Sequence, residues 1–191
     1  MNPGDQAFDD AASAFAQTAI GGGLAPEVDA LIVEAGRLRE QPEQALDLLL
    51  RARAAAPRHP VPLIALYRFH FYGHRLLQAR AVGEDALAIA RTALGPDFGD
   101  QPLDRDATRY DAAVRFYLFT LKGLAYLNLR LGELDEARDL LRELRRLDPE
   151  DQVGGALLQQ VLAHHERHLE ADDDIGTQAA YPPRGWTEAR P

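Results

Sequence analysis

Apolar residues recur along the chain at intervals of three and four residues, with charged residues between them. In the stretch that follows Pro26, for example, Val28, Leu31, Ala35 and Leu38 fall on one stripe of a helix. The alternation of apolar and polar residues that marks a half-buried strand is absent from residues 27–170. The pattern therefore predicts an all-α fold.

Proline and glycine divide this pattern into seven expected helices. Proline is favourable in the first turn of a helix, where its missing N–H would have no partner, and Pro26 and Pro42 are placed in this way. Gly83 and Gly132 are expected to lie in turns between helices. The predicted helices cover residues 27–40, 42–56, 62–81, 84–94, 107–131, 134–148 and 152–170.

Short connections between successive helices predict antiparallel helical hairpins. A longer loop over residues 96–107 is rich in proline, glycine and aspartate, and Asp106 is the expected cap of the helix that follows. We expect three parts: a flexible N-terminal segment over residues 1–25, one helical domain over residues 26–170, and a flexible C-terminal tail over residues 171–191.

Composition and charge exclude several classes of function. The formal net charge is -9, so the long-range field of the protein repels nucleic-acid backbones and anionic membranes. The absence of cysteine excludes disulfides and thiolate metal sites and fits a reducing compartment. No run approaches the roughly 20 apolar residues of a membrane span, and the N-terminus has no secretory pattern. We expect a cytoplasmic protein with neither nucleic acid nor membrane as its partner.

Two of the predicted hairpins share an internal pattern. Ala45 precedes Pro57, and Ala137 precedes Pro149, by the same 12 residues. In this pattern, and in the stretch "LKGLAYLNLRLGELDEARDLLRELRRLDP", the chain resembles the tetratricopeptide repeat (TPR) family. That resemblance implies a short right-handed solenoid of about three repeats, closed by a C-terminal capping helix.

The middle repeat fits the TPR pattern less regularly. Aligning it on Ala86 gives intervals of 41 and 51 residues between the small residues at 45, 86 and 137, against about 34 in a regular array. Within "LYRFHFYGHR", residues 66–75, Phe69, Tyr72 and Gly73 are expected on the packing face of a helix, with Gly73 at the closest approach.

Three further phrases, "LYRFHFYGHRLLQA", "RFYLFTLKGLAYLNLRLGELDEA" and "LDPEDQVGGA", are similar to short TPR proteins associated with nitrogen-fixation gene clusters in bacteria. This resemblance implies an accessory role beside nitrogenase or its maturation machinery, without catalysis and without a cofactor. A nitrogenase component would then be a candidate partner.

The TPR resemblance also implies a binding groove lined by the first helix of each hairpin. Helical spacing places two groups of aromatic and basic residues on separate stripes, which suits a peptide with acidic residues or a terminal carboxylate. The alternative is that the aromatic rings belong to the core. The candidate partner-binding residues are Arg37, Tyr67, His70, His74, Phe119, Lys122, Tyr126 and Arg130.

Two other functions remain open from the sequence. Histidines four residues apart can share a metal ion on a helix, and the pairs are His70 with His74 and His164 with His168. A metal site would need a third ligand, which the aspartates at residues 172–174 could supply to the second pair, and we assign no metal. A self-associating structural protein, for example a homodimer, is the other alternative. The sequence contains no phosphate-binding glycine loop and no serine-nucleophile motif, and we expect no enzymatic activity.

Overall fold

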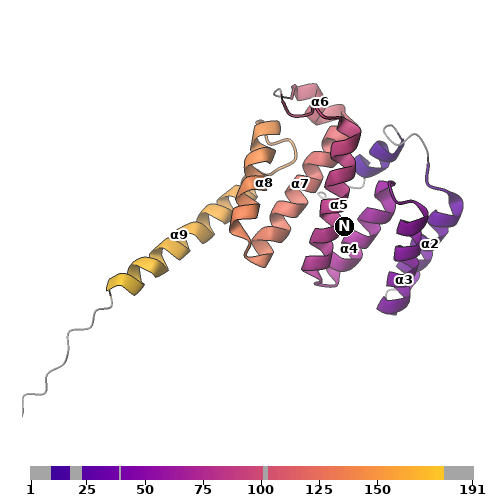
Figure 1. The fold of residues 1–191 in the computed structure, drawn as a ribbon, viewed down its shortest axis with the longest axis horizontal. Helices are drawn as coiled ribbons and strands as arrows, with labels where there is room; N and C mark the ends of the chain where they lie inside the picture. Colours follow the sequence, from indigo (N-terminus) through magenta and orange to yellow (C-terminus); the bar gives the residue numbers. More distant parts are fainter. Residues whose placement is uncertain (1–9, 18–22, 39, 101–102, 179–191) are drawn as a thin grey trace, which may run out of the picture.

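The computed structural model describes residues 10–17, 23–38, 40–100 and 103–178, with side chains placed as far as residue 168. These residues form helices and no strand, which confirms the all-α prediction. None of the helices in the described ranges is both long enough and apolar enough to cross a membrane. The labelled helices in Figure 1 are α2 (Pro26–Arg37), α3 (Pro42–Ala55), α4 (Pro60–Tyr72), α5 (Leu76–Leu94), α6 (Arg105–Tyr110), α7 (Ala112–Leu131), α8 (Leu134–Leu147) and α9 (Ala156–Gln178).

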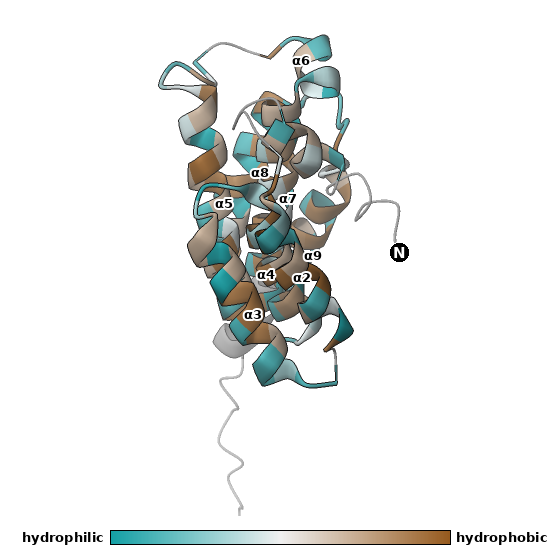
Figure 2. Cartoon of the chain, turned by 90° about the vertical axis from the view of Figure 1, so that its right-hand side faces the viewer, coloured by the Kyte–Doolittle hydropathy of each residue, from teal (hydrophilic) through white to brown (hydrophobic). Residues whose placement is uncertain are grey.

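The helices pack in pairs that follow one another along the molecule (Figure 1). α2 packs on α3, α4 on α5, and α7 on α8, while α5 also packs against α7 and joins the second pair to the third. α9 packs on α8 and α7 at its start and then extends away from the other helices (Figure 1). Figure 2 shows hydrophobic and hydrophilic residues interspersed along α3 and α5, as expected for helices that bury one face.

The turn between α4 and α5 lies ten residues earlier than the sequence predicts. α4 ends at Tyr72, and Gly73 is its C-cap. His74 follows with a positive φ of 57°, and the N–H of Arg75 donates to the carbonyl of His70 at 2.8 Å. A left-handed residue closed by such a bond is a common helix ending. The expected helix over residues 62–81 is therefore wrong, because the chain reverses at residues 73–75.

Gly83 lies inside α5 and not in a turn. A Cβ atom added there would be 2.8 Å from Cδ2 of Leu124 and 3.7 Å from Cε2 of Tyr67. Glycine at this position therefore allows α5 to approach α7 closely. Gly73, expected at a close helix contact, instead ends α4 and is exposed. Tyr72, expected on the packing face, is 60% exposed.

The position of this turn also changes the spacing of the small residues. Ala45, Ala79 and Ala137 are each the fourth residue of their helix, α3, α5 or α8, and each is at most 2% exposed. Ala45 and Ala79 are 34 residues apart, the interval of a regular TPR array. Ala86, on which the sequence comparison aligns the middle repeat, is also buried but lies two turns further along α5 than Ala79.

A short helix and a second cap divide the expected helix over residues 107–131. The Asp104 carboxylate accepts from the N–H of Ala107 at 2.6 Å and caps α6. The Asp111 carboxylate accepts from the N–H groups of Ala113 at 2.8 Å and Val114 at 3.0 Å and caps α7. Asp106, the expected cap, is in the first turn of α6. Because Asp111 has an extended backbone between two helices, the chain bends there.

Residues 10–17 form a helix that packs into the core, within the segment of residues 1–25 that the sequence predicts to be flexible. Ala11, Ala12, Phe15 and Ala16 are at most 3% exposed. Phe15 stacks on Phe116 of α7, with ring centroids 4.9 Å apart. At the other end of the described chain, α9 continues past residue 170 to Gln178, although the sequence predicts a flexible tail from residue 171. Residues 179–191, with Trp186, lie outside the described part of the chain.

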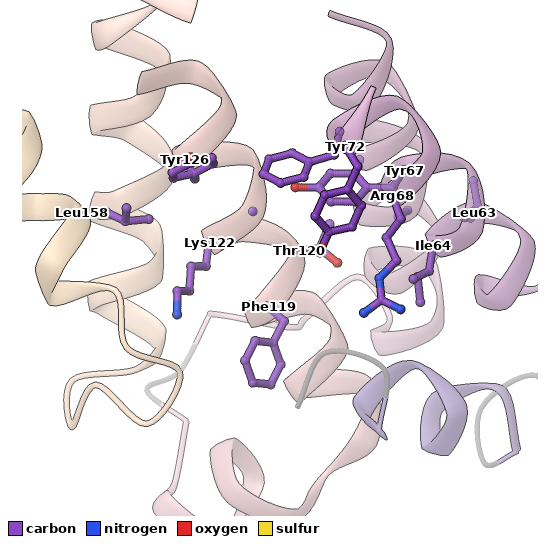
Figure 3. A pocket seen from close by; sticks show the side chains of 14 residues that line it. Leu63, Ile64, Tyr67, Arg68, Tyr72, Phe119, Thr120, Lys122, Tyr126 and Leu158 are labelled. Carbon is purple, nitrogen blue, oxygen red and sulfur yellow. The ribbon is translucent and has the colours of Figure 1, made fainter. Parts of the chain in front are cut away.

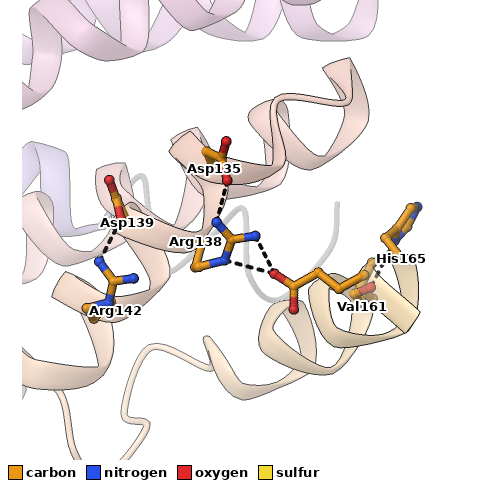
Figure 4. A network of polar contacts seen from close by, with 7 residues as sticks. Asp135, Arg138, Asp139, Arg142, Val161 and His165 are labelled. Carbon is orange, nitrogen blue, oxygen red and sulfur yellow. Dashed lines mark hydrogen bonds and ion pairs between the residues drawn. The ribbon is translucent and has the colours of Figure 1, made fainter. Parts of the chain in front are cut away.

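Polar contacts fasten α9 to α8. Arg138 of α8 donates to Asp135 one turn earlier on the same helix, and its Nε and Nη2 donate to Glu166 of α9 at 2.8 and 2.7 Å (Figure 4). The hydrogen bonds that Arg138 donates to Asp135 and Glu166 raise the pKa of Arg138, so its charge is retained. Below these contacts, Leu158 and Leu162 enter the main hydrophobic core. The first half of α9 is therefore held by apolar contacts at Leu158 and Leu162 and by an ionic contact at Glu166.

Candidate functional site

A groove with a volume of about 540 Å³ lies between α4, α7 and the start of α9, and α5 contributes to its base. Figure 3 shows side chains of α4 facing side chains of α7 across it, with Leu158 of α9 at one side. Aromatic and aliphatic residues dominate the lining, and Arg68 and Lys122 add two cationic groups. The lining residues are Leu63, Ile64, Tyr67, Arg68, Phe71, Tyr72, Gly83, Ala86, Phe119, Thr120, Lys122, Gly123, Tyr126 and Leu158.

Three aromatic rings connect the two walls. Tyr67 and Phe71, one turn apart on α4, are nearly parallel, with centroids 5.9 Å apart. Phe71 contacts Tyr126 of α7, with centroids 5.8 Å apart. The hydroxyl of Tyr67 is 3.2 Å from the position that a Cβ at Gly123 would take. Glycine at positions 83 and 123 therefore leaves the space that the Tyr67 ring and hydroxyl occupy.

Lys122 has a structural contact in addition to its place in the groove. Its Nζ donates to the carbonyl of Val153 at 2.6 Å, which holds the loop between α8 and α9 against α7. Burial lowers the pKa of Lys122, and the charge of Asp151 partly opposes this effect. Asp148, which is 2% exposed, orders the same loop by accepting from the N–H groups of Gln152 and Val153, both at 2.9 Å. The cation is thus held at one fixed place in the wall.

The structure brings together four of the candidate residues predicted from the sequence, and a fifth adjoins them. Tyr67, Phe119, Lys122 and Tyr126 line the groove. Arg130 lies beside it, where its Nη1 donates to the Tyr126 hydroxyl at 2.9 Å. The spacing that places Phe119, Lys122 and Tyr126 on one stripe of α7 therefore describes that wall correctly.

The other three candidate residues lie outside the groove. His70 is 8% exposed, and its Nδ1 has no hydrogen-bond partner among the described residues. Burial and the charge of Arg75 lower the pKa of His70. His74 is exposed in the turn after α4, and Arg37 of α2 is exposed and donates to Glu34 at 3.1 Å. Because α4 ends before residue 74, His70 and His74 do not share a helical stripe.

Sequence reasoning missed most of the α4 wall. Phe71 follows Tyr67 by four residues, so the two share a helix face, and Arg68 and Tyr72 repeat that spacing on the next stripe. Helical spacing is thus a local signal for this wall, whereas the predicted groove contains His70 and His74 in place of Arg68, Phe71 and Tyr72. The contribution of Leu158 depends on how α9 folds back and has no local sequence signal.

The second histidine pair has a different geometry. Nε2 of His164 is 3.1 Å from Nε2 of His168 on α9, and both side chains are exposed. No group of three or more histidine, aspartate or glutamate side chains within the described ranges is arranged to hold a metal ion. The described chain therefore offers at most a two-ligand arrangement at this place.

The fold and the groove define an all-helical protein with an aromatic and aliphatic groove that includes two cationic side chains. The chain is 32% identical over 151 residues to the "uncharacterized 19.8 kDa protein in nifW 5'region" of Azotobacter chroococcum mcd 1, an alignment that covers 76% of this chain and 84% of that protein. The chain belongs to the same family as that protein. No family model and no solved structure matches it.

Proposed function

We propose that this protein is a noncatalytic protein-interaction module, built from TPR-like helical hairpins, that binds a protein partner in the groove between α4, α7 and α9. The observation that carries the proposal is the lining of the groove. The rings of Tyr67, Phe71 and Tyr126 and several aliphatic side chains form one continuous apolar surface across the groove, and Arg68 and Lys122 lie beside it. Such a surface suits an amphipathic peptide that carries acidic groups.

The TPR-like part of the proposal rests on packing and spacing. Three pairs of helices follow one another, and buried alanines occupy the fourth position in the second helix of each pair. The 34-residue interval between Ala45 and Ala79 agrees with a regular TPR array. The segment with α6 lengthens the next interval, to 58 residues, before Ala137. On this arrangement α4 and α7 are the first helices of their repeats, and the groove lies on the concave face.

The proposed context follows from the relative in the nifW 5' region. We propose an accessory protein for nitrogenase or its maturation, located in the cytoplasm, where the absence of cysteine fits a reducing compartment. The partner would be a component of that machinery with an acidic, amphipathic segment.

Affinity purification with matched variants tests this function. Tyr72 is 60% exposed on the rim of the groove, and Tyr110 is 69% exposed on α6, outside the lining. The tagged wild-type protein is purified from its native organism under nitrogen-fixing conditions, beside Tyr72→Glu and Tyr110→Glu. We expect a partner retained by the wild type and Tyr110→Glu and lost from Tyr72→Glu. The same proteins retained by all three would contradict the groove as the binding site.

A further inference from the structure

The helix of residues 10–17 is the part of the fold that the proposed function leaves unused. Its buried face consists of Ala11, Ala12, Phe15 and Ala16, while Asp10, Ser13 and Gln17 are exposed. These positions are spaced as one stripe of a helix, so the segment is amphipathic, with small residues around a single aromatic anchor. Phe15 is 0% exposed and stacks on Phe116, with an interplanar angle of 13°.

This helix packs against the elements that form the groove. Ala12 and Phe15 belong to the same hydrophobic cluster as Leu63 and Ile64 of α4, and Phe119 of α7 packs against that cluster. Leu63, Ile64 and Phe119 also line the groove. In Figure 3 the helix of residues 10–17, in pale indigo, lies at the lower right of the view, below Arg68. The N-terminal helix and the groove are thus neighbouring sections of one surface between α4 and α7.

The docking contact accounts for the helical form of this segment. Helices shorter than about 12 residues are marginal in water on their own, and residues 10–17 form only two turns. Docking on the surface between α4 and α7 therefore stabilises this segment as a helix. The side chains that this surface accommodates are alanines, which allow the helices to approach closely, and one phenylalanine, which packs against Phe116.

We propose that residues 10–17 are an intrachain ligand of the surface between α4 and α7, and that a partner helix with the same alanine and phenylalanine stripe displaces them. This inference rests on the proposed function and narrows the partner from an amphipathic peptide to a helix of this pattern. A partner that lies along the groove toward the start of α7 meets the N-terminal helix, because Leu63 and Ile64 line the groove and share one hydrophobic cluster with Ala12 and Phe15, and Phe119 packs against that cluster.

Tethering gives the resident helix an advantage. A segment joined to its site by a short linker has an effective concentration on the order of millimolar. A free helix of equal intrinsic affinity therefore binds the wild-type protein much more weakly than it binds a protein whose own segment is undocked. A partner would overcome this difference by additional contacts in the remaining groove, with Tyr67, Phe71 and Tyr126.

A peptide supplied in trans tests the inference. The probe is a fluorescent peptide with the sequence of residues 6–20, and its binding to the full chain is followed by fluorescence anisotropy. Two variants weaken the resident helix: Phe15→Ala removes the anchor, and Ala16→Asp places a charge in the buried stripe. Ser13→Ala, at an exposed position of the same helix, is the matched control. A second peptide with Phe15→Ala tests the requirement for the anchor.

We expect at least tenfold tighter peptide binding by Phe15→Ala and Ala16→Asp than by the wild type and Ser13→Ala, with no binding of the anchorless peptide. Thermal unfolding selects the variants that fold cooperatively, and either one is sufficient. Equal binding to all four proteins, or no binding to any folded variant, would overturn the inference. Failure of this peptide test would not contradict the proposed function of the groove. That function is tested separately by the purification with Tyr72→Glu, which uses the native partner and leaves the N-terminal helix unaltered.

Discussion

Replacing Gly83 with alanine distinguishes the close contact between α5 and α7 from the turn that the sequence suggested. The added Cβ would lie 2.8 Å from Cδ2 and 3.3 Å from Cγ of Leu124. Leu124 is 2% exposed, so its side chain has little room to move away. Overpacking of this kind costs about 1–3 kcal/mol, whereas glycine to alanine inside a helix gains about 0.5–1 kcal/mol. We expect Gly83→Ala to lower the free energy of unfolding by about 1 kcal/mol.

Gly36 provides the matched control for this substitution. It lies in α2, and no described atom would be within 4 Å of an added Cβ. Gly36→Ala should therefore be neutral or stabilising by up to about 1 kcal/mol. Urea denaturation followed by far-UV circular dichroism measures both variants, and the slope with denaturant checks that the unfolding reaction is unchanged.

Leu124→Ala shows whether the clash is the cause. In that background the Cβ at residue 83 loses its close contact with Leu124 and keeps only an ordinary van der Waals contact with Tyr67 at 3.7 Å. Gly83→Ala should then lose its penalty and keep the gain in helix propensity. The reasoning is refuted if Gly83→Ala stabilises the protein as Gly36→Ala does, or if its effect is the same with and without Leu124. Either result would mean that Leu124 does not crowd the position of Gly83.

Three further predictions follow from single contacts. Burial lowers the pKa of His70, so the unfolded chain binds a proton at this residue more readily than the folded chain does. The stability that this group contributes is therefore complete above about pH 6.5 and falls as the pH drops below that value. His70→Gln should flatten the pH dependence of the free energy of unfolding in urea between about pH 7.5 and 5.5. Asp111→Ala should destabilise the protein by about 1 kcal/mol through loss of the α7 cap, while Asp106→Ala, outside the cap, should change thermal stability little. Glu166→Gln should weaken the contact with Arg138 and speed amide hydrogen exchange in α9 but not in α7, more so at low salt.

The sequence predicts helix type and most helix starts because these depend on local signals. Pro26 and Pro42 stand at the first position of α2 and α3, and Gly132 ends α7 with a φ of 81°. The α4–α5 turn is different, since a glycine in a helical pattern can be either a break or a close contact. At Gly83 the choice depends on Tyr67 and Leu124, which approach it from α4 and α7.

Long-range contacts also explain the other differences. The segment of residues 10–17 is short and alanine-rich, and its helix depends on the contact of Phe15 with Phe116, about a hundred residues later in the chain. The α7 wall of the groove follows from helical spacing within one helix. The sequence assigns Tyr67, His70 and His74 to the α4 wall because the expected helix extends to residue 81. Since α4 ends at Tyr72, His74 leaves this stripe, and Phe71, one turn after Tyr67, contacts Tyr126 of α7.

Site-specific photo-crosslinking tests the central claim, that the groove between α4, α7 and α9 is a protein-binding site. A photoreactive phenylalanine derivative replaces Tyr72 on the groove rim or, as the control, Tyr110 on α6. The tagged proteins are irradiated in nitrogen-fixing cells of the native organism, and the adducts are identified by mass spectrometry. The account predicts one specific protein adduct from position 72 that position 110 does not give. Adducts from position 110 alone, or the same adducts from both positions, would contradict it.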